Sequence, residues 1–378
     1  MKILVLGGDG FCGWPTSLRL AKNHDVFILD NLSRRQIDDD LGTNSLTSIR
    51  DYSHRINVAR ELGFNLDADI ADVTDYEQLK FWIKKVKPNA IIQFAEQRAA
   101  PYSMLGSKES TYTVNNNITG THNVLAAIVE VDPTIHLVHL GTMGVYGYSK
   151  EFGSIPEGYL DITINETNEE ASVLYPTNPG SVYHMTKSLD QIMFQFYKKN
   201  WNLNITDLHQ GIVWGTQTDE TNMVPELVNR FDYDGIYGTV LNRFIVQAAV
   251  NHPLTVYGTG GQRRAFIHIN DTAECIKLAI ENPEDTDRVR IFNQVSEVRG
   301  VYELAEIINE KYGTEIMHYV NPRKELSKND LEVSNVGLRS LGFNPITLND
   351  ELINDIKFIA DSVKDKVNKD KIMSSPEW

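Results

Sequence analysis

Cysteine is scarce in this chain, long apolar runs are missing, and basic residues are outnumbered by acidic ones. The 378 residues include two cysteines, Cys12 and Cys275, which excludes a disulfide framework and a cysteine-rich zinc site. No run of about 18 apolar residues occurs, so the sequence predicts no membrane span. Lysine and arginine number 36 against 51 aspartates and glutamates, a net charge of −15. Such a chain does not suit nucleic acid, whose phosphates require a basic face.

The remaining composition is that of an ordinary globular protein. Hydrophobic residues make up 41% of the chain and charged residues 23%, and no internal repeat is visible. The length allows one large core or two lobes, and we expect two. Because the chain opens directly on an apolar run, residues 2–6, we expect a cytoplasmic protein and not a secreted one.

A glycine-rich turn follows that first apolar run and precedes a helical stretch. Gly7, Gly10 and Gly13 form the turn, residues 26–29 form a second apolar run, and Asp30 ends it. This order of strand, glycine turn, helix, strand and acid is typical of a βαβ dinucleotide-binding unit. Glycines allow a tight turn and let the backbone approach a pyrophosphate. A plain turn is the alternative, because G-x-x-G-x-x-G is less specific than G-x-G-x-x-G.

The acid at the end of the second run predicts the cofactor. Asp30 would accept hydrogen bonds from an adenine ribose and repel a 2′-phosphate, which favours NAD over NADP. Arg34 and Arg35 offer the opposite alternative, because nearby arginines can receive such a phosphate. Since Asp30 stands at the strand end where selection occurs, we expect NAD. We expect Cys12 to be a small packing residue of the turn.

Apolar runs alternate with helical stretches, and this alternation predicts the fold class. Further strands and helices are expected in turn at residues 64–66, 75–87, 90–94, 112–130, 135–140 and 203–206. We predict an α/β protein with a Rossmann-type doubly wound parallel sheet in residues 1–207. Residues 208–378 are expected to form mainly a smaller C-terminal α/β substrate-binding lobe, with segments that cross back. Residues 31–61 are long and polar for a connection, which predicts a binding loop or lid.

Tyr183 and Lys187 lie four residues apart at the start of a predicted helix. This spacing places the phenol and the ammonium on one helix face. A free tyrosine has a pKa of about 10, and a nearby cation lowers it by favouring the phenolate. Such a pair can take a proton from a substrate alcohol while a hydride leaves the same carbon. A chance pair on a surface helix is the alternative.

Polar side chains follow the predicted strands, where a doubly wound sheet binds its ligands. Arg98 follows residues 90–94 and is expected to contact an anion, with a solvated surface charge as the alternative. Thr142 follows residues 135–140, and its hydroxyl could bond a substrate alcohol. Gln210 follows the sixth predicted strand.

The glycine turn, Thr142, Tyr183 and Lys187 together resemble the extended short-chain dehydrogenase/reductase superfamily, which acts on nucleotide sugars. Residues 258–268 also resemble its second-lobe motif, with Ala265 where an aspartate is usual. The resemblance implies that Arg264 meets the diphosphate. It further implies a homodimer through the helices at 113–130 and 181–199.

A closer resemblance, to the UDP-sulfoquinovose synthase family, covers nearly the whole chain. It is carried by residues 7–14, 30–35, 96–104, 140–144, 183–184, 210–211, 218–220 and 241–244, with Ile372, Met373 and Trp378. The resemblance implies conversion of UDP-glucose and sulfite to UDP-sulfoquinovose and water. Oxidation at C4 would acidify the C5 proton, loss of water would give a 5,6-ene, and sulfite would add at C6. NAD would be recycled within the site.

The resemblance also implies the site residues. The catalytic residues would be Thr142, Tyr183, Lys187 and His184. The cofactor would be bound by Gly7, Gly10, Phe11, Cys12, Gly13, Asp30, Asn31, Arg34, Arg35, Asp69, Ile70, Asn117, Tyr183 and Lys187. The substrate would be bound by Arg98, Thr142, Gln210, Arg243, Gln262, Arg264 and Arg323. No metal site, nucleic acid or membrane is implied.

One departure separates this chain from nucleotide-sugar 4,6-dehydratases, which follow the threonine with Asp-Glu. Met143 and Gly144 stand there instead, which argues against a simple dehydratase. We hypothesise that this pair leaves room for sulfite at C6. Val145 replaces an expected acid, so the C5 base stays open. His184 is a candidate proton carrier, with a packing role as the alternative.

Two other functions remain open from the sequence. An NAD-dependent nucleotide-sugar 4-epimerase or dehydratase needs only the threonine, the tyrosine, the lysine and NAD. Ile212 argues against the epimerase, which usually carries asparagine there. A non-catalytic NAD-binding sensor would keep the fold alone, and the intact catalytic set argues against it.

Overall fold

The computed structural model describes residues 1–147, 154–284, 286–323 and 326–372. Residues 148–175 are a polar insertion before Tyr183. Its residues 148–153 lie outside the described part, as do Met373 and Trp378, which help to carry the resemblance.

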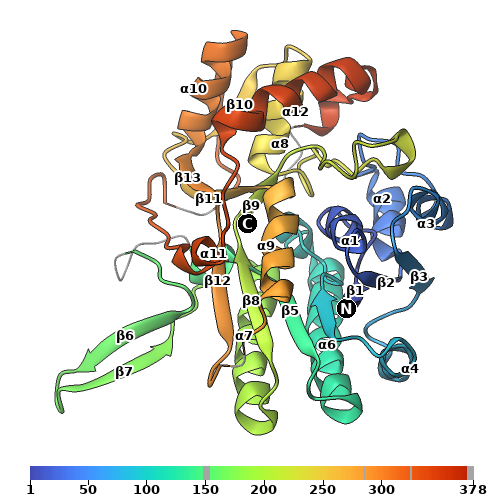
Figure 1. Cartoon of the computed structure of the whole chain (residues 1–378). Coiled ribbons are helices and arrows are strands. Elements are labelled where there is room, and N and C mark those ends of the chain that lie inside the picture. The colour runs from blue at the N-terminus through green and yellow to red at the C-terminus, as the bar shows by residue number, and fades with distance from the viewer. Residues whose placement is uncertain (148–153, 285, 324–325, 373–378) are drawn as a thin grey trace.

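Seven parallel strands form the central sheet (Figure 1). Their spatial order is β12 (Arg290–Gln294), β8 (Ile205–Gln210), β5 (His136–Thr142), β4 (Ala90–Gln93), β1 (Lys2–Leu6), β2 (Asp25–Asp30) and β3 (Leu66–Ile70). β1 pairs with both β2 and β4, so the strand order reverses at β1. A doubly wound sheet binds its ligand beyond the carboxyl ends of the strands at such a point. The predicted fold class is confirmed.

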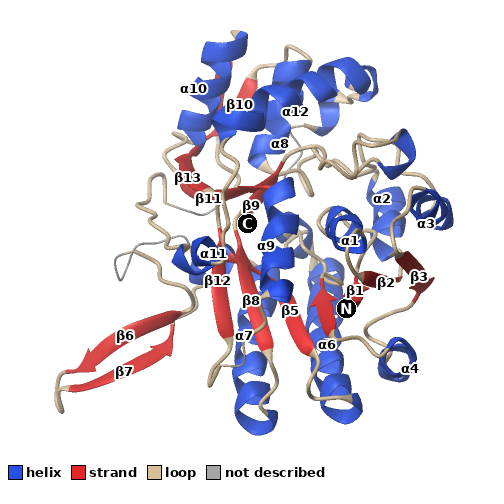
Figure 2. Ribbon diagram, viewed as in Figure 1, coloured by secondary structure: helices blue, strands red, loops and turns tan. Residues whose placement is uncertain are grey.

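Helices cover both faces of this sheet (Figure 2). Successive residues of a strand point to opposite faces, so Ile3 packs with one set of helices and Leu4 with the other. The first set is α1 (Gly13–Ala21), α3 (Tyr52–Glu61) and α9 (Ile269–Glu281). The second set is α4 (Tyr76–Val86), α6 (Ser107–Val131) and α7 (Val182–Trp201). Strands buried on both faces explain the continuous apolar runs in the sequence.

The C-terminal part adds a smaller lobe above the carboxyl edge of the sheet (Figure 1). Its strands are β9 (Ile212–Trp214), β11 (Arg263–His268) and β13 (Glu297–Gly300) in one sheet, and β10 (Leu254–Tyr257) and β14 (Ile316–Tyr319) in another. Its helices include α8 (Val240–Ala249), α10 (Val301–Tyr312) and α12 (Leu348–Ser362). Residue 207, the predicted domain boundary, falls inside β8, and β12 returns to the large sheet. The two-domain division therefore stays a prediction.

The sequence predicts a binding loop or lid in residues 31–61. Residues 31–35 and Ile37 do line a cavity, but the segment is largely helical. It contains α2 (Ser33–Leu41) and α3. Tyr52, Ile56 and Ala59 of α3 join the core beside the sheet. Their spacings of four and three residues place them on one helix face, a signal that is weak because polar residues surround it.

Two predicted element boundaries and one predicted segment also differ from the structure. β3 begins at Leu66 instead of residue 64, and α6 begins at Ser107, five residues before the predicted start. The insertion before Tyr183 carries a hairpin of β6 (Tyr159–Ile164) and β7 (Glu169–Leu174), which projects from the body (Figure 1). No helix in the described part of the chain combines the length and hydropathy needed to cross a bilayer.

Candidate active site

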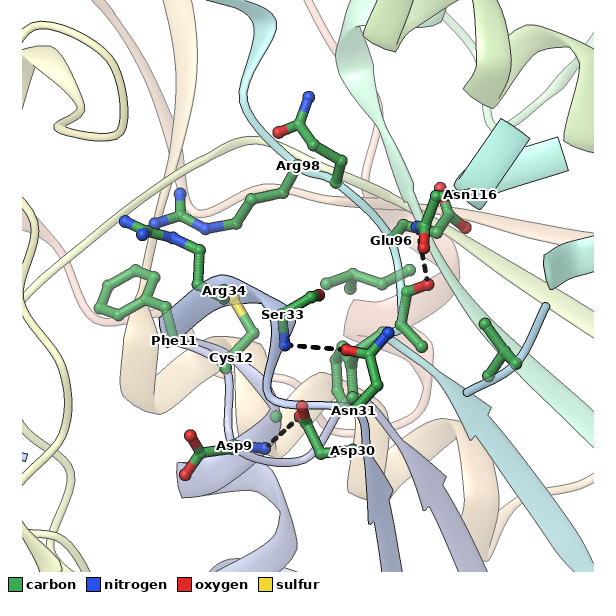
Figure 3. Close-up of a pocket in the computed structure, with 18 of the residues that line it drawn as sticks. Asp9, Phe11, Cys12, Asp30, Asn31, Ser33, Arg34, Glu96, Arg98 and Asn116 are labelled. Atoms are coloured by element: carbon green, nitrogen blue, oxygen red, sulfur yellow. Dashed lines mark hydrogen bonds between the residues drawn. The ribbon is translucent and has the colours of Figure 1, made fainter. Parts of the chain in front are cut away.

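Two cavities meet at the carboxyl edge of the central sheet. The first follows the glycine turn and the end of β2, and the second lies under the C-terminal lobe. Both are lined by Phe11, Cys12, Arg98, Gly141, Tyr183, Gln210 and Tyr237. Figure 3 shows side chains around a pocket at the glycine turn, including Asp30, Glu96 and Arg98. Two ligands, one in each cavity, would therefore meet at Tyr183.

The glycine turn packs too tightly for side chains at two of its positions. A Cβ on Gly7, whose φ is +81°, would lie 2.7 Å from the backbone nitrogen of Ala95. A Cβ on Gly13 would lie 2.2 Å from the carbonyl oxygen of Gly7. Cys12, at the N-cap of α1, makes no side-chain capping bond. In the first turn of α1, Trp14 donates its N–H to Gly10 at 3.0 Å, Thr16 donates to Cys12 at 3.3 Å and Pro15 has no N–H, so Gly13 is the residue that could offer its N–H to a ligand in the cavity. This cradle fits the pyrophosphate of a dinucleotide.

Asp30 lies at the end of β2 in the wall of the first cavity. Its carboxylate accepts the backbone N–H groups of Asp9 at 2.9 Å and Leu32 at 2.8 Å. Burial, and next the charge of Asp9, raise the pKa of Asp30 to about 6. Asn31, also in this wall, donates to Asp72 at 2.9 Å. Asp30 is therefore an ionised acceptor at neutral pH.

The two arginines that could receive a 2′-phosphate are both held by acids. Arg35 pairs with Asp9 through Nε at 2.7 Å and Nη2 at 3.0 Å. Arg34 pairs with Asp38 and Asp232, and its guanidinium lies 3.5 Å from the ring centre of Tyr237. These partners, together with the carboxylate of Asp30, make the cavity suit NAD better than NADP.

Tyr183 and Lys187 lie in the first turns of α7, which Ser181 caps by accepting the backbone N–H of His184 at 3.2 Å. The backbone N–H of Tyr183 donates to Ser103 Oγ at 3.1 Å. Both side chains line the first cavity, and Tyr183 also lines the second. The spacing of four has thus placed the phenol and the ammonium at the same cavity.

Thr142 ends β5 and lines the second cavity, while its Oγ1 accepts the backbone N–H of Gly144 at 3.1 Å. Its hydroxyl hydrogen therefore does not serve that bond and can be donated to a ligand.

Met143 and Gly144 do not open space for an anion. The side chain of Met143 is 1% exposed and packs with Tyr146 and Ile155, outside both cavity walls. A Cβ on Gly144 would lie 2.2 Å from Cδ2 of His184. The hypothesis of room for sulfite at this pair is wrong, because the imidazole of His184 fills that room.

His184 faces the second cavity among cationic side chains. Its Nδ1 lies 3.1 Å from Ser181 Oγ. Burial, then Arg323 and Arg264, lower the pKa of His184 to about 3. The imidazole is therefore neutral at neutral pH, and the same surroundings that keep it neutral make it a weak base.

The second cavity brings together the predicted substrate residues. Its wall includes Arg98, Thr142, Gln210, Arg243, Gln262, Arg264 and Arg323. Arg243 is buried and donates to the carbonyl of Gly238 at 2.9 Å. Arg98 pairs with Asp232 at 2.5 Å. Several cations in one concave wall suit an anionic ligand such as a diphosphate.

Three predicted cofactor residues lie outside the cavity walls. Asp69 and Ile70 are exposed at the end of β3. Asn117 is fully buried and accepts the backbone N–H of Gln97 at 2.8 Å while donating to Thr186 at 3.0 Å. Asn117 thus ties the loop after β4 to α7, and its neighbour Asn116 lines the first cavity instead.

Sequence reasoning also missed residues that the fold brings to the site. Glu96, Arg230 and Tyr237 line the first cavity, and Asp232 holds Arg34 and Arg98. Glu96 was visible as a polar residue after a strand. The others lie in an irregular stretch more than 100 residues from their partners, where no local pattern marks them.

The model of the family described as NAD dependent epimerase/dehydratase matches residues 3–294. The chain belongs to this family. NAD, the cofactor in the family's description, is the one that Asp30 and the paired arginines favour.

Relatives within the family differ widely in their sequence identity to this chain. The chloroplastic UDP-sulfoquinovose synthase of Spinacia oleracea is 44% identical, over 100% of this chain and 79% of its own length. The UDP-sulfoquinovose synthase of Sulfolobus acidocaldarius is 41% identical over 91% of this chain and 88% of its own. The dTDP-D-glucose 4,6-dehydratase of Dictyostelium discoideum is 25% identical over 75% of this chain. The cytoplasmic location expected from the sequence stays a prediction, since the spinach relative is chloroplastic.

Solved structures confirm the fold. A UDP-glucose 4-epimerase from Thermotoga maritima superposes with a TM-score of 0.71 at 19% identity, covering 95% of this chain and 98% of its own. A UDP-glucuronic acid 4-epimerase from Bacillus cereus, solved with NAD, gives 0.69 at 20% identity, covering 95% and 99%.

Proposed function

We propose that the protein is a UDP-sulfoquinovose synthase, which converts UDP-glucose and sulfite to UDP-sulfoquinovose and water. The observation that carries this choice is the 44% identity to the spinach synthase over the whole chain, against 25% for the dehydratase. The replacement of the dehydratase acid pair by Met143 and Gly144 supports the same choice.

Each of the two cavities would bind one of the two ligands. The first would hold NAD, with Asp30 on the adenine ribose and the glycine turn from Gly7 to Gly13 against the pyrophosphate. The second would hold UDP-glucose, with Arg243, Arg264 and Arg323 near its diphosphate. We further propose that residues 208–378 serve mainly to bind this nucleotide sugar.

NAD in this position would accept a hydride from C4 of the sugar and return it at the end of the cycle. Tyr183, as phenolate beside the Lys187 ammonium, takes the C4 hydroxyl proton, and Thr142 donates to the same oxygen. The ketone at C4 acidifies the C5 proton, and His184 is the base that we propose there, once the substrate diphosphate offsets the charges of Arg323 and Arg264 that, with burial, keep its pKa low. Loss of water from C6 gives the 5,6-ene, to which sulfite adds at C6.

Arg98 is the side chain that we assign to sulfite. It lines both cavities, as Tyr183 does, and among the described cationic residues of the two walls it alone belongs to both. Its partner Asp232 would hold the guanidinium in place before the anion arrives.

We also propose a homodimer formed through α6 and α7. Met185, Leu189, Ile192 and Phe196 follow one face of α7 and are 38%, 37%, 56% and 53% exposed. Apolar residues at this spacing on a surface helix mark a face that pairs with another helix.

Mass spectrometry after incubation with UDP-glucose, with and without sulfite, tests the proposed reaction. We expect a sulfite-dependent product in which a sulfonate has replaced a hydroxyl group. UDP-galactose as the product in both cases would support the 4-epimerase instead. Loss of the 6-hydroxyl without sulfur incorporation would show that sulfite is not the donor.

A further inference from the structure

Lys187 is surrounded by a buried group of charged side chains beneath the cofactor cavity. Its Nζ lies 2.8 Å from Glu96 Oε2, 3.0 Å from His139 Nε2 and 2.6 Å from the carbonyl oxygen of Leu140. The side chains of Lys187 and Glu96 are 4% and 3% exposed. The ammonium is therefore tied to an acid that the proposed reaction does not yet use.

Glu96 is held in place by a series of buried polar side chains. Its Oε1 lies 2.9 Å from His139 Nε2, and His139 Nδ1 lies 2.8 Å from Asp207 Oδ1. His139 on β5 and Asp207 on β8 are register partners, so their side chains emerge on the same face of the sheet. Asp207 in turn holds His209 at 2.9 Å. The carboxylate of Glu96 cannot turn away without breaking these contacts.

The charges around Lys187 favour its protonated form. Burial lowers the pKa of Lys187, but Glu96, Tyr183 and Asp190 outweigh burial and raise it above the ordinary lysine value. Burial and Lys187 lower the pKa of His139, but Asp207 and Asp190 raise it to about 10. Ligand atoms of Glu96, His139 and Asp190 lie within 4.8 Å of one another, as in a metal site, and the ammonium contacts two of the three.

We propose that Glu96 is a positioning residue that acts through Lys187, keeping its ammonium charged and aimed at the wall beside Tyr183. The proposal rests on the proposed function, because it assumes that the phenol of Tyr183 carries the substrate proton. Glu96, Tyr183 and Lys187 all line the first cavity, so the effect is exerted where the reaction occurs.

The purpose of a permanently charged Lys187 follows from the proton balance of the proposed cycle. The C4 hydroxyl proton passes to the phenolate in the first step and returns to the C4 oxygen in the last. A neutral Lys187 would no longer favour the phenolate of Tyr183, so the first step would lose its base. With Glu96 ionised beside it, Lys187 is already protonated, and the substrate proton stays on Tyr183.

Substitution Glu96→Gln, studied in the NAD-loaded protein, tests this role. It keeps the shape of the side chain and removes the charge, so we expect the pKa of Lys187 to fall by about one unit or more. Nitrogen NMR of the Lys187 side chain, assigned by its loss in Lys187→Arg, measures this pKa without substrate. The alkaline limb of the pH–rate profile should move to lower pH by the same amount.

Two further variants separate positioning from folding. Glu96→Asp keeps the charge and should restore the alkaline limb toward that of the unaltered protein. Glu220→Gln removes another buried carboxylate, 1% exposed and paired with Arg19 and Lys22 outside both cavities, and should leave the pKa of Lys187 unchanged.

The proposal is overturned if Glu96→Gln shifts the Lys187 pKa no more than Glu220→Gln does. If Glu96→Gln does not fold, Asp190→Asn should lower the same pKa by a smaller amount, and no lowering would contradict the account. Failure of the proposed function would show differently, as no sulfonate product from the unaltered protein while the Lys187 titration still responds to Glu96.

Discussion

Tyr183 is the side chain on which the proposed chemistry depends most, because it lines both cavities. Substitution Tyr183→Phe removes the group that takes the C4 proton and keeps the ring. We expect turnover to fall by about 10²- to 10⁴-fold, with bound NAD retained. Product formation by mass spectrometry and NAD released on denaturation measure the two effects. Unchanged turnover would refute the proton-transfer role.

Gly144 has a role that the structure explains through His184. A Cβ there would lie 2.2 Å from the imidazole, so Gly144→Ala must displace it. Since a displacement of about 1 Å can cost roughly 10²-fold in rate, we expect a loss of that order in turnover. NAD content should not change, because neither residue lines the first cavity. Steady-state rates and NAD content check this.

Gly180→Ala is the matched control for that substitution. Gly180 lies just before α7, the helix that carries His184, but a Cβ on Gly180 would meet nothing within 4 Å. Equal losses of turnover in the two alanine variants would contradict the account of Gly144.

Asp30 makes NAD binding depend on pH. Its pKa is raised to about 6, so the carboxylate that accepts the ribose hydroxyls is ionised above this pH and protonated below it. For protein stripped of NAD, we expect affinity to weaken as pH falls through 6, by up to about tenfold per unit. Calorimetric titration at several pH values measures this. A pH dependence that persists in Asp30→Asn would assign it to another group.

At the scale of the element, α7 serves two purposes. One face presents Tyr183 and Lys187 to the cavity, and another presents an exposed apolar row. If this row pairs two copies, Phe196→Asp should convert a dimer into a monomer, because a charge would be buried at the interface. Analytical ultracentrifugation of both proteins gives the masses. Phe81→Asp on α4 is the control, since Phe81 is 56% exposed and Phe196 is 53% exposed.

The elements that sequence reasoning found are those whose pattern is local. β1, β2 and β4 are largely buried and are marked by apolar runs, and β5 alternates histidines with apolar residues. The spacing of Tyr183 and Lys187 predicted their shared helix face. α2 was not predicted from the sequence, because Asp38 is its only buried residue. Its surface is held by ion pairs with distant acids, which leave no apolar period to read.

At the scale of the whole molecule, the site depends on contacts between distant segments. Asp232 from the stretch before α8 reaches Arg98 after β4 and Arg34 on α2. Sequence motifs named Arg34 and Arg98 as candidate contacts, and the resemblance named many other residues that line the two cavities. Neither showed that an acid holds both arginines, because such pairing depends on how the lobe folds back over the sheet.

Because two cavities share one tyrosine, we propose that a single site removes a hydride from C4, exchanges the C6 hydroxyl for a sulfonate, and returns the same hydride. UDP-glucose deuterated at C4, incubated with sulfite and the protein, tests this claim directly. We expect a UDP-linked sulfonate sugar that retains the deuterium at C4, as read by mass spectrometry and NMR. A product without sulfur, or a sulfonate that has lost the deuterium, would contradict this claim.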